Sequence, residues 1–403
     1  MDTMSVAPTP LLPASRIMYN AERGLFDLRQ GRPLFITDKG ASPSDGGLVS
    51  GALVAAVDGL DLDSLDRFRA MGNEALRLVV TAHRIASMGL SPAEINELEH
   101  AGYSIPLRRA VNMQEILALA CSSDVVHETA ASQLSSATPG EAAGLSLVRL
   151  SRLLPAVVAM PAGIPPASRI DEALSTGELL SVDVGEVNEY FTASCDGHVV
   201  AISEAPVPLS ENEESRFVLF RESHGLQEHV AIIVGNPKYW PDPLPVRLHS
   251  ACFTGDLFGS LKCDCGEQLL GSMKFFEEKG GGVLLYLAQE GRGIGLNNKF
   301  RAYTLQENGL DTIDADRTLG FGPDERRYGV AAQILHEIGI GRIELLTNNP
   351  DKVQAMQDAG IEVVNRRPLH GTLNRYNRPY VEAKVVRAGH WLHDMLAQST
   401  AGD

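Results

Sequence analysis

The sequence predicts an α/β protein of two domains, and three observations lead to this prediction. The chain has 403 residues, which is too long for one ordinary hydrophobic core. Segments typical of strands and of helices alternate along it, most regularly over residues 343–365. The composition, with 44% hydrophobic and 21% charged residues, is that of a globular protein. We place the boundary near residue 200, which gives domains of 1–200 and 201–403.

In the first half, segments rich in apolar and β-branched residues predict strands at 32–38 and 157–162. Apolar residues at helical spacing predict a long helix over 62–89. A second helix is expected over 91–102, because a serine cap, a proline in the first turn and a final glycine frame it. The Pro- and Ala-rich stretch 155–168 is typical of an extended connector or an edge strand.

The second half shows a more regular alternation. Continuous apolar runs predict five strands, at 229–235, 244–252, 281–287, 343–347 and 361–365. Helical spacing and terminal glycines predict four helices, at 265–280, 297–309, 325–339 and 350–360. The last strand, helix and strand form a βαβ unit, so a parallel pair of strands is expected there.

Charge and composition exclude several classes of protein. The formal net charge of −16 disfavours a nucleic-acid partner, which needs a basic surface. No apolar run reaches the roughly 20 residues of a membrane span. The first fifteen residues lack the basic start and apolar core of a secretory signal, so we expect a cytoplasmic protein. The odd count of five cysteines disfavours a disulfide framework.

Three of the cysteines, Cys252, Cys263 and Cys265, lie within fourteen residues. Closely spaced free thiols favour a soft metal ion, and zinc fits sulfur ligands best. Three protein ligands leave one coordination position for water, whose pKa a metal ion lowers to about 7. His249 is a poor fourth ligand, because residues 249 and 252 point to opposite faces of a strand. A structural zinc ion and a chance group of buried cysteines are the alternatives.

Two polar loops each follow a predicted strand and precede a helix. In residues 289–299, Gly291 lets the backbone approach a ligand, Arg292 offers a fork for phosphate, and Glu290 offers an acceptor for a guanine edge. In residues 347–352, Thr347 and Lys352 flank a helix start that attracts phosphate. An ordinary glycine turn and a simple asparagine cap are the alternative interpretations of these two loops.

The segment 320–329 is the third polar stretch. It places Asp324, Glu325, Arg326 and Arg327 together at an expected helix start, where arginines are less usual than acids. A purely structural interpretation stays open for these residues. Tyr303, inside a predicted helix, would by its position be a core residue.

Taken in order, these signals resemble GTP cyclohydrolase II from about residue 205 to residue 395. The matching stretches run nearly without gaps, and together they are far more specific than any one motif. They read RLHSAC, TGDLFGSLKCDCGEQL, LLYLAQEGRGIGLNNKFRAYTLQENGLDT, LGFGPDERRYGVAAQIL, LLTNNPDKV and AGIEVVNRRPL. The resemblance implies a mixed α/β catalytic domain.

The resemblance implies a role for each matching residue. The three cysteines match the ligands of one zinc ion per subunit. Asp324 matches the proton acceptor, Arg326 the nucleophile and Tyr303 a catalytic tyrosine. The residues expected to contact the nucleotide are Arg247, Leu248, His249, Ser250, Ala251, Gln268, Glu290, Gly291, Arg292, Thr312, Thr347 and Lys352. Ala251 stands where the family often has Glu, which removes no ligand and no catalytic group. The family also implies a homodimer.

The implied reaction hydrolyses GTP to 2,5-diamino-6-(5-phosphoribosylamino)pyrimidin-4(3H)-one, formate and pyrophosphate, the first step of riboflavin biosynthesis. Loss of carbon as formate needs a strong water nucleophile, which a three-thiolate zinc site provides. Release of pyrophosphate needs positive charge, which Mg²⁺, Arg292 and Lys352 supply. Because the pKa of arginine is above 12, stabilisation of the α-phosphate is the physically simpler role for Arg326.

Two other functions stay open at this point. One is a relative that acts on GTP in pyrimidine catabolism or antibiotic synthesis. The other is a regulator that binds GTP around a structural zinc ion without turnover.

The first half resembles 3,4-dihydroxy-2-butanone 4-phosphate synthase, an α+β domain that often precedes this enzyme. The similarity lies in the order of GRPLFITD and GGLVSGALVA. In the active family an acid-rich loop after the strand holds Mg²⁺ and substrate. Here that loop, 38–47, keeps only Asp38 and Asp45. Metal binding and proton abstraction need such acids, so we expect this domain to have lost synthase activity.

Overall fold

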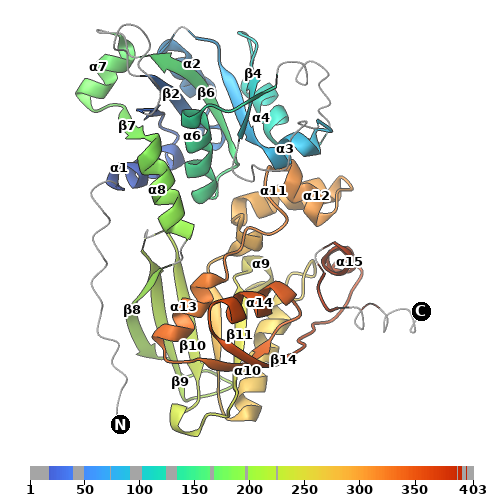
Figure 1. The fold of residues 1–403 in the computed structure, drawn as a ribbon. Helices are drawn as coiled ribbons and strands as arrows, with labels where there is room; N and C mark the ends of the chain where they lie inside the picture. The colour runs from blue at the N-terminus through green and yellow to red at the C-terminus, as the bar shows by residue number, and fades with distance from the viewer. Residues whose placement is uncertain are drawn as a thin grey trace. The chain divides into compact units, whose positions relative to one another are not determined.

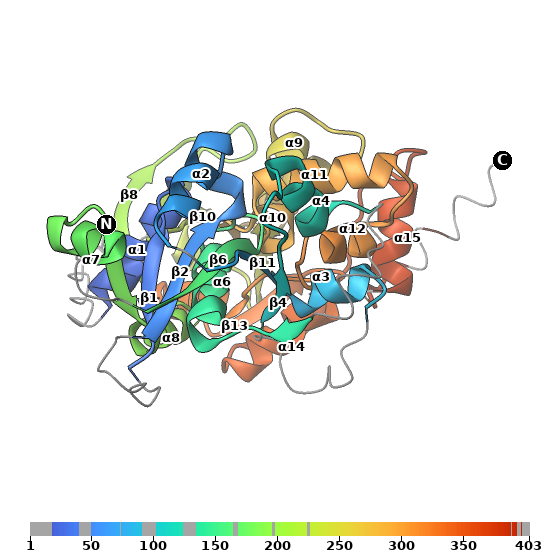
Figure 2. The same cartoon turned by 90° about the horizontal axis from the view of Figure 1, so that it is seen from above.

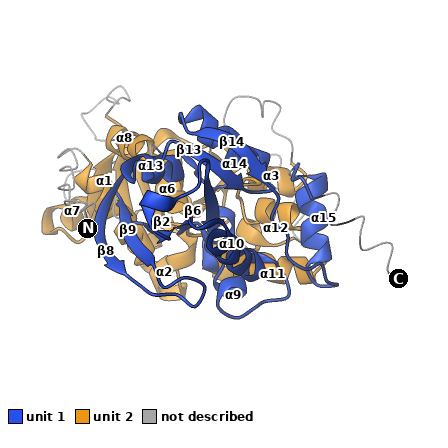
Figure 3. Cartoon of the chain, turned by 90° about the horizontal axis from the view of Figure 1, so that it is seen from below, with its two compact units in different colours: residues 1–12, 194–296, 325–403 blue, residues 13–193, 297–324 orange. Residues whose placement is uncertain are grey.

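The chain forms two compact units, each built on one seven-stranded sheet (Figure 1). The computed structural model describes residues 18–39, 50–72, 74–90, 102–123, 134–163, 168–195, 198–223, 226–387, 389–392 and 396. Among the residues described, unit 1 takes those from 194–296 and 325–403, and unit 2 takes those from 13–193 and 297–324 (Figure 3). Helices accompany both sheets, which confirms the predicted α/β class.

The segment 297–324 departs from the predicted domains, because it belongs to the compact unit of the first half. It contains α11 (Leu296–Glu307), apart from its first residue, and α12 (Thr312–Thr318). Inside unit 2, the buried hydroxyl of Thr81 donates to the Gly320 carbonyl at 2.6 Å, and buried Arg84 donates to the Thr318 carbonyl at 3.2 Å. A single division at residue 200 therefore does not separate the two units.

The sheet of unit 2 has the strand order β5-β4-β3-β6-β2-β1-β7, and of these neighbours β1 and β7 pair in parallel. Its strands are β1 (Leu34–Thr37), β2 (Ser50–Ala56), β3 (Arg77–Thr81), β4 (Gly102–Pro106), β5 (Ser135–Ser136), β6 (Ala156–Gly163) and β7 (Leu180–Asp183). Its other helices are α1 (Tyr19–Arg29), η1 (Val57–Gly59), α2 (Leu62–Ala70), α3 (Ala82–Ser87), α4 (Met113–Cys121), α6 (Pro139–Leu150), α7 (Arg169–Thr176) and α8 (Val184–Cys195). Helix α6 packs against β1, β2, β3 and β6 (Figure 2).

Two predictions for the first half were wrong. The expected helix over 62–89 is α2, then β3, then α3, because the residues from Leu78 to Val80 are fully buried between β4 and β6. β-Branched residues favour such a buried strand. The stretch 155–168 contains β6, which lies inside the sheet between β3 and β2, not at an edge. Most of the helix expected over 91–102 falls outside the described residues, and Gly102 begins β4.

The sheet of unit 1 has the order β14-β13-β11-β12-β10-β9-β8. Its strands are β8 (Val199–Pro206), β9 (Ser215–Glu222), β10 (Glu228–Val234), β11 (Leu244–Ser250), β12 (Gly282–Leu287), β13 (Arg342–Leu346) and β14 (Glu362–Arg367). Its helices are η3 (Pro237–Tyr239), α9 (Phe253–Asp256), α10 (Cys265–Lys279), η4 (Glu290–Gly293), α13 (Gly329–Glu337), α14 (Pro350–Asp358) and α15 (Arg378–Val386). All five predicted strands are present, and β13 and β14 are parallel as expected.

Successive residues of strand β12 in unit 1 pack into two different apolar clusters, one on each face of the sheet. Val283 and Leu285 on β12 belong to a large apolar cluster that also contains residues of α13 and α14. Leu284, the residue between them, belongs to a smaller cluster with Met273 and Phe276 of α10. Because neighbouring side chains of a strand point to opposite faces, α13 and α14 cover one face of the sheet and α10 covers the other.

The helix expected over 325–339 begins later than predicted, since α13 starts at Gly329. Asp324 to Arg327 therefore lie in irregular backbone before the helix rather than in its first turn. Within the described part of the chain, we find no helix with the length and apolar character needed to span a membrane.

Candidate active site

Three neighbouring parallel strands end at one edge of the unit 1 sheet. Strand β11 pairs in parallel with both β12 and β13. The carboxyl ends of parallel strands meet at the same edge, and ligands commonly bind there. Cys252 follows β11, Glu290 follows β12, and Thr347 follows β13. The topology therefore brings together the thiol motif and the first two polar loops.

The three cysteines of the motif form a compact sulfur cluster. The Sγ atoms of Cys252, Cys263 and Cys265 lie within 4.8 Å of one another, and those of Cys252 and Cys263 are 3.6 Å apart. Two sulfurs bound to one zinc ion at ~2.3 Å in tetrahedral geometry would be about 3.8 Å apart. The spacing and the chemistry of these donors therefore fit a soft metal ion.

The glycine at position 255 allows the cluster to close. A Cβ atom at Gly255 would lie 2.8 Å from the Cys263 Sγ atom and 3.0 Å from the Cys252 Sγ atom. These distances are well below an ordinary carbon–sulfur contact, so any side chain here would displace the thiols. Gly255 is thus a structural requirement of the sulfur cluster.

A buried carboxylate holds the first cysteine in place. Asp256, whose side chain is 2% exposed, accepts hydrogen bonds from the backbone N–H of Cys252 at 2.9 Å and from the Tyr286 hydroxyl at 3.0 Å. The Nε2 atom of His249 lies 3.0 Å from the same carboxylate. Its ring stacks on that of Tyr286. Burial lowers the pKa of His249, although its hydrogen bond with Asp256 acts in the opposite direction.

A second chain of hydrogen bonds links β11 to the sulfur motif. Buried Arg247 donates to the Leu346 carbonyl at 2.9 Å and to the side-chain oxygen of Gln268 at 2.5 Å. The amide of Gln268 donates in turn to Asp264 at 2.5 Å. Asp264 lies between two of the cysteines in the sequence, so Arg247 is coupled to the sulfur motif through two polar side chains. Burial lowers the pKa of Arg247 to about 10, which leaves it charged at neutral pH.

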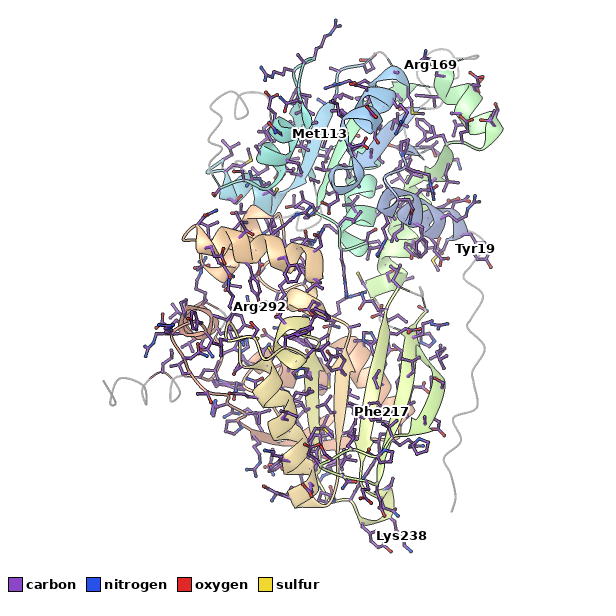
Figure 4. The ribbon with its side chains drawn as sticks, turned by 180° about the vertical axis from the view of Figure 1, so that it is seen from behind. Tyr19, Met113, Arg169, Phe217, Lys238 and Arg292 are labelled. Carbon is purple, nitrogen blue, oxygen red and sulfur yellow. The ribbon has the colours of Figure 1, made fainter. Side chains whose placement is uncertain are left out.

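The glycine-rich loop has an unusual backbone. Gly291 and Arg292 have φ angles of 62° and 59°, in the left-handed region, which costs a residue with a side chain roughly 1–2 kcal/mol. Such strain is typical of functional sites. The Arg292 carbonyl accepts from the N–H of Glu325 at 3.0 Å, and the Glu290 carboxylate accepts from the N–H of Phe253 at 2.6 Å. The loop therefore joins the third polar stretch to the residue after Cys252; Figure 4 labels Arg292.

Lys352 and Arg326 share an aromatic neighbour. The Lys352 ammonium donates to the Leu248 carbonyl at 2.7 Å and lies 5.5 Å from the centre of the Tyr328 ring. The Arg326 guanidinium lies 5.4 Å from the same ring. The Thr347 hydroxyl accepts from the N–H of Asn349 at 3.0 Å, so it supports the turn that leads to Lys352.

The pKa of the buried His390 imidazole indicates that several cations lie near one another. The pKa of His390 falls to about 2, first because the ring is buried and then because of nearby positive charges. These charges belong to Lys384, Arg326, Arg292 and Lys352. Three loops and α15 therefore concentrate positive charge in one region of unit 1, which favours a polyanionic ligand.

Sequence reasoning missed several residues of this region. Lys384, Tyr380 and His390 follow the stretches that carried the resemblance, and no recognised spacing marks them. Asp256 lies within a matching stretch but was not singled out. A further network is buried behind the loops: His229 accepts from the Ala288 N–H through Nδ1 and therefore donates to Glu222 through Nε2. The carboxylate of Glu222 also lies 3.5 Å from the guanidinium of Arg327.

The predicted contacts of β11 have different environments. The side chain of Leu248 lies in the large apolar core, while the hydroxyl of Ser250 is buried and has no hydrogen-bond partner among the described residues. Ala251 follows the strand and donates its N–H to the Leu287 carbonyl. Along this segment, Arg247 and His249 lie on the α10 face, opposite Leu284 and Tyr286 of β12.

Three predicted residues belong to unit 2. Tyr303 lies on α11 with the Lys299 ammonium 5.7 Å from its ring, and Thr312 begins α12 and accepts from Gln306 at 3.2 Å. Asp324 is exposed and is the last residue of this unit. Their roles stay predictions.

Comparison with known proteins points to one family. Residues 200–368 match the family model described as GTP cyclohydrolase II. GTP cyclohydrolase-2 of Xylella fastidiosa (strain 9a5c) is 39% identical over 373 residues, which cover 92% of this chain and 86% of that protein. GTP cyclohydrolase-2 of Azospirillum brasilense is 38% identical over 398 residues, covering 96% and 97%.

Other similarities cover the chain differently. Riboflavin biosynthesis protein RibBA of Bacillus subtilis (strain 168) is 48% identical over 167 residues, which are 41% of this chain and 42% of that protein. Among solved structures, a two-domain 3,4-dihydroxy-2-butanone 4-phosphate synthase from A. baumannii matches with 16% identity and a TM-score of 0.31. That match covers 87% of this chain and 99% of the solved one.

Substitution of Gly255 by Ala should weaken metal binding at least tenfold, because the added methyl group collides with two sulfurs. The measurement is the metal content of the purified protein together with chelator competition for bound zinc. Gly341→Ala is the matched control, since a Cβ atom there meets nothing within 4 Å. Equal zinc affinity in the two variants would contradict this account of the cluster.

The depressed pKa of His390 predicts a specific dependence of stability on pH. Below pH ~6.5 the unfolded chain takes up a proton on this histidine that the folded chain does not, so the free energy of unfolding falls by up to about 1.4 kcal/mol per pH unit. His390→Gln removes this contribution and should flatten the decline between about pH 6.5 and pH 5. Urea titrations across this range measure the effect.

The control for that experiment is His198→Gln, at an exposed histidine of the same unit. It should leave the slope of stability against pH as in the wild-type protein. If His390→Gln and the wild type lose stability equally below about pH 6.5, the buried imidazole is not neutral in the folded state.

Proposed function

Since this chain belongs to the GTP cyclohydrolase II family, we propose that it hydrolyses GTP to formate, pyrophosphate and 2,5-diamino-6-(5-phosphoribosylamino)pyrimidin-4(3H)-one. This reaction is the first step of riboflavin biosynthesis. Two relatives named GTP cyclohydrolase-2 match over more than nine tenths of the chain, and a protein named for riboflavin biosynthesis matches over 41% of it. The observation that carries the proposal is that unit 1 holds both a three-sulfur cluster with the spacing of metal ligands and a group of buried and half-buried cations.

We propose zinc as the metal ion of this site. Cys252, Cys263 and Cys265 would hold it, since their sulfurs have the spacing of tetrahedral ligands. When bound, the ion acts as a Lewis acid that activates water for attack at C8 of the guanine ring. Asp256 orients Cys252 through its backbone N–H, and Gly255 keeps the space between the sulfurs clear.

The cations of unit 1 suit the triphosphate. Arg292 presents a planar fork on a rigid, left-handed backbone, and Lys352 is held by a backbone carbonyl. With Mg²⁺ on the phosphate oxygens, these charges would stabilise the departing pyrophosphate. Arg326 lies in the same charged region, which supports stabilisation of the α-phosphate as its role.

Recognition of guanine is assigned to acceptors beside the metal. The carboxylate of Glu290 is fixed by the N–H of Phe253, the residue after Cys252, so it lies next to the sulfur cluster. A carboxylate there would accept from the amino and ring N–H groups of guanine. The fixed side chain of Gln268 supplies a second polar contact. Asp324 as the proton acceptor and Tyr303 as a catalytic tyrosine are retained on the family resemblance alone.

For unit 2 we propose that synthase activity is absent. Of the two acids that remain in its loop, Asp38 is within the described residues and Asp45 is outside them. The relatives that match nearly the whole chain carry the name GTP cyclohydrolase-2, which supports a single activity. A homodimer and a cytoplasmic location complete the proposal, and both rest on the family.

Purified protein incubated with GTP, Mg²⁺ and zinc should release formate and pyrophosphate in equal amounts. Cys263→Ser should lower kcat by at least a hundredfold without unfolding the protein, because it removes a metal ligand. Cys195→Ser, at an exposed cysteine outside the cluster, should retain full activity. Formate release and pyrophosphate release are measured separately.

The products separate this function from its alternatives. A retained triphosphate or formyl group would assign the chain to a related pathway such as pyrimidine catabolism or antibiotic synthesis. Binding of GTP without turnover, equal in the wild type and in Cys263→Ser, would make it a regulator with a structural metal ion.

Incubation of the full chain with ribulose 5-phosphate and Mg²⁺ should yield no butanone phosphate, because the acid-rich loop is depleted. Product formation is followed by chromatography, with an active synthase as the positive control. Appearance of 3,4-dihydroxy-2-butanone 4-phosphate above the blank would overturn the assignment of unit 2.

A further inference from the structure

The chain beyond the family match contributes to the site. The match ends at residue 368, and α15 follows it. The segment from Leu369 to Trp391, which includes α15, is tied at both ends to Asn348, the residue after Thr347. The side-chain amide of Asn348 donates to the Leu369 carbonyl at 2.5 Å. The backbone carbonyl of Asn348 accepts from the N–H of Trp391 at 2.9 Å. Because both anchors lie on one residue just after β13, the segment that carries α15 is fixed near the carboxyl end of that strand.

One cation of α15 lies beside the sulfur motif. The Lys384 ammonium is 4.0 Å from the carboxylate of Asp264, which sits between two of the cysteines, and its side chain is only 13% exposed. A distance of 4.0 Å is beyond that of a hydrogen bond, and the other oxygen of Asp264 accepts from Gln268. The carboxylate therefore attracts the ammonium without forming a hydrogen bond with it.

The ring of Tyr380 collects two cations. The Lys384 ammonium lies 4.0 Å from the ring centre, and the Arg292 guanidinium lies 5.6 Å from it. Two like charges beside one ring repel each other, and an anion placed near both would relieve this repulsion. Lys384 and Arg292 are also two of the four cations that depress the pKa of His390.

We propose that Lys384 is a further phosphate-binding residue and that Tyr380 is a positioning residue, which holds Lys384 and Arg292 toward the triphosphate. The ligand class is a nucleoside triphosphate or its pyrophosphate product. This inference rests on the proposed function for the identity of the substrate. Its geometric basis, two cations on one ring beside the metal motif, does not depend on turnover.

The test compares affinities for ligands with and without phosphate. In the full-length zinc-loaded protein, Lys384→Met removes the charge but keeps the length of the side chain. It should weaken binding of pyrophosphate and of GTP about tenfold, since a charge-assisted contact is lost, and should leave the affinity for guanosine unchanged. Titration calorimetry measures the three affinities without requiring catalysis.

Tyr380 is tested by a pair of variants. Tyr380→Phe keeps the ring and should change the affinity for pyrophosphate less than twofold. Tyr380→Leu removes the cation–π contacts and should weaken it about fivefold, again without an effect on guanosine. In turnover, Lys384→Met and Tyr380→Leu should each raise KM for GTP by a larger factor than they lower kcat.

Lys238→Met is the matched control. Lys238 also lies over a tyrosine ring, that of Tyr239 at 5.7 Å, but it is on η3 at the other end of the unit 1 sheet from Arg292 (Figure 4). Its loss removes the same charge and should leave all three affinities unchanged.

Two results would overturn the inference. One is an unchanged affinity of Lys384→Met for pyrophosphate. The other is an equal loss for guanosine and for GTP, which would mean that α15 only supports the fold. If wild-type protein binds pyrophosphate through Lys384 but releases no formate from GTP, the proposed function fails and the phosphate site stands.

Discussion

The parallel pairing of β11 with its two neighbours is the constraint on which the site depends. Three chain segments that are far apart in sequence must leave the sheet at the same edge, because β12 and β13 run in the same direction as β11. A one-residue slip of β11 would exchange its two faces. Arg247 and His249 would then enter the apolar core, and Leu248 would face α10. Register, not local sequence, therefore places the polar side chains.

The terminal carbonyls of these strands also hold the buried cations. Arg247 of β11 donates to the last carbonyl of β13, and Lys352 donates to a carbonyl of β11. A backbone carbonyl stabilises a cation without cancelling its charge, unlike a carboxylate. Arg247 and Lys352 therefore keep their positive charge in a region of low solvent exposure. Electrostatic attraction is stronger there than at the surface, which suits a ligand that carries several negative charges.

Much of unit 1 follows from the sequence, because its strands are continuous apolar runs and its cysteines are closely spaced. The helix expected over 62–89 was wrong since helical spacing and a buried Val-Val pair coexist in that stretch, and pairing with β4 and β6 decided between them. Lys384 and His390 escaped notice because their surroundings come from loops that only folding brings together. Asp256 was not singled out because its three hydrogen-bond donors come from residues that only the fold brings around it.

The segment 297–324 comes from the second half of the chain but depends on the first half for its packing. Its helices pack within unit 2, where Arg301 pairs with Asp58 and Asn298 donates to the Arg152 carbonyl. This segment also carries Tyr303 and Asp324, which we propose as a catalytic tyrosine and as the proton acceptor. A gene deletion that discarded residues 1–193 would remove the ion-pair and hydrogen-bond partners of these helices. Even without a chemical activity of its own, unit 2 would then be retained by selection, because it supplies the contacts that hold α11 and α12 in place.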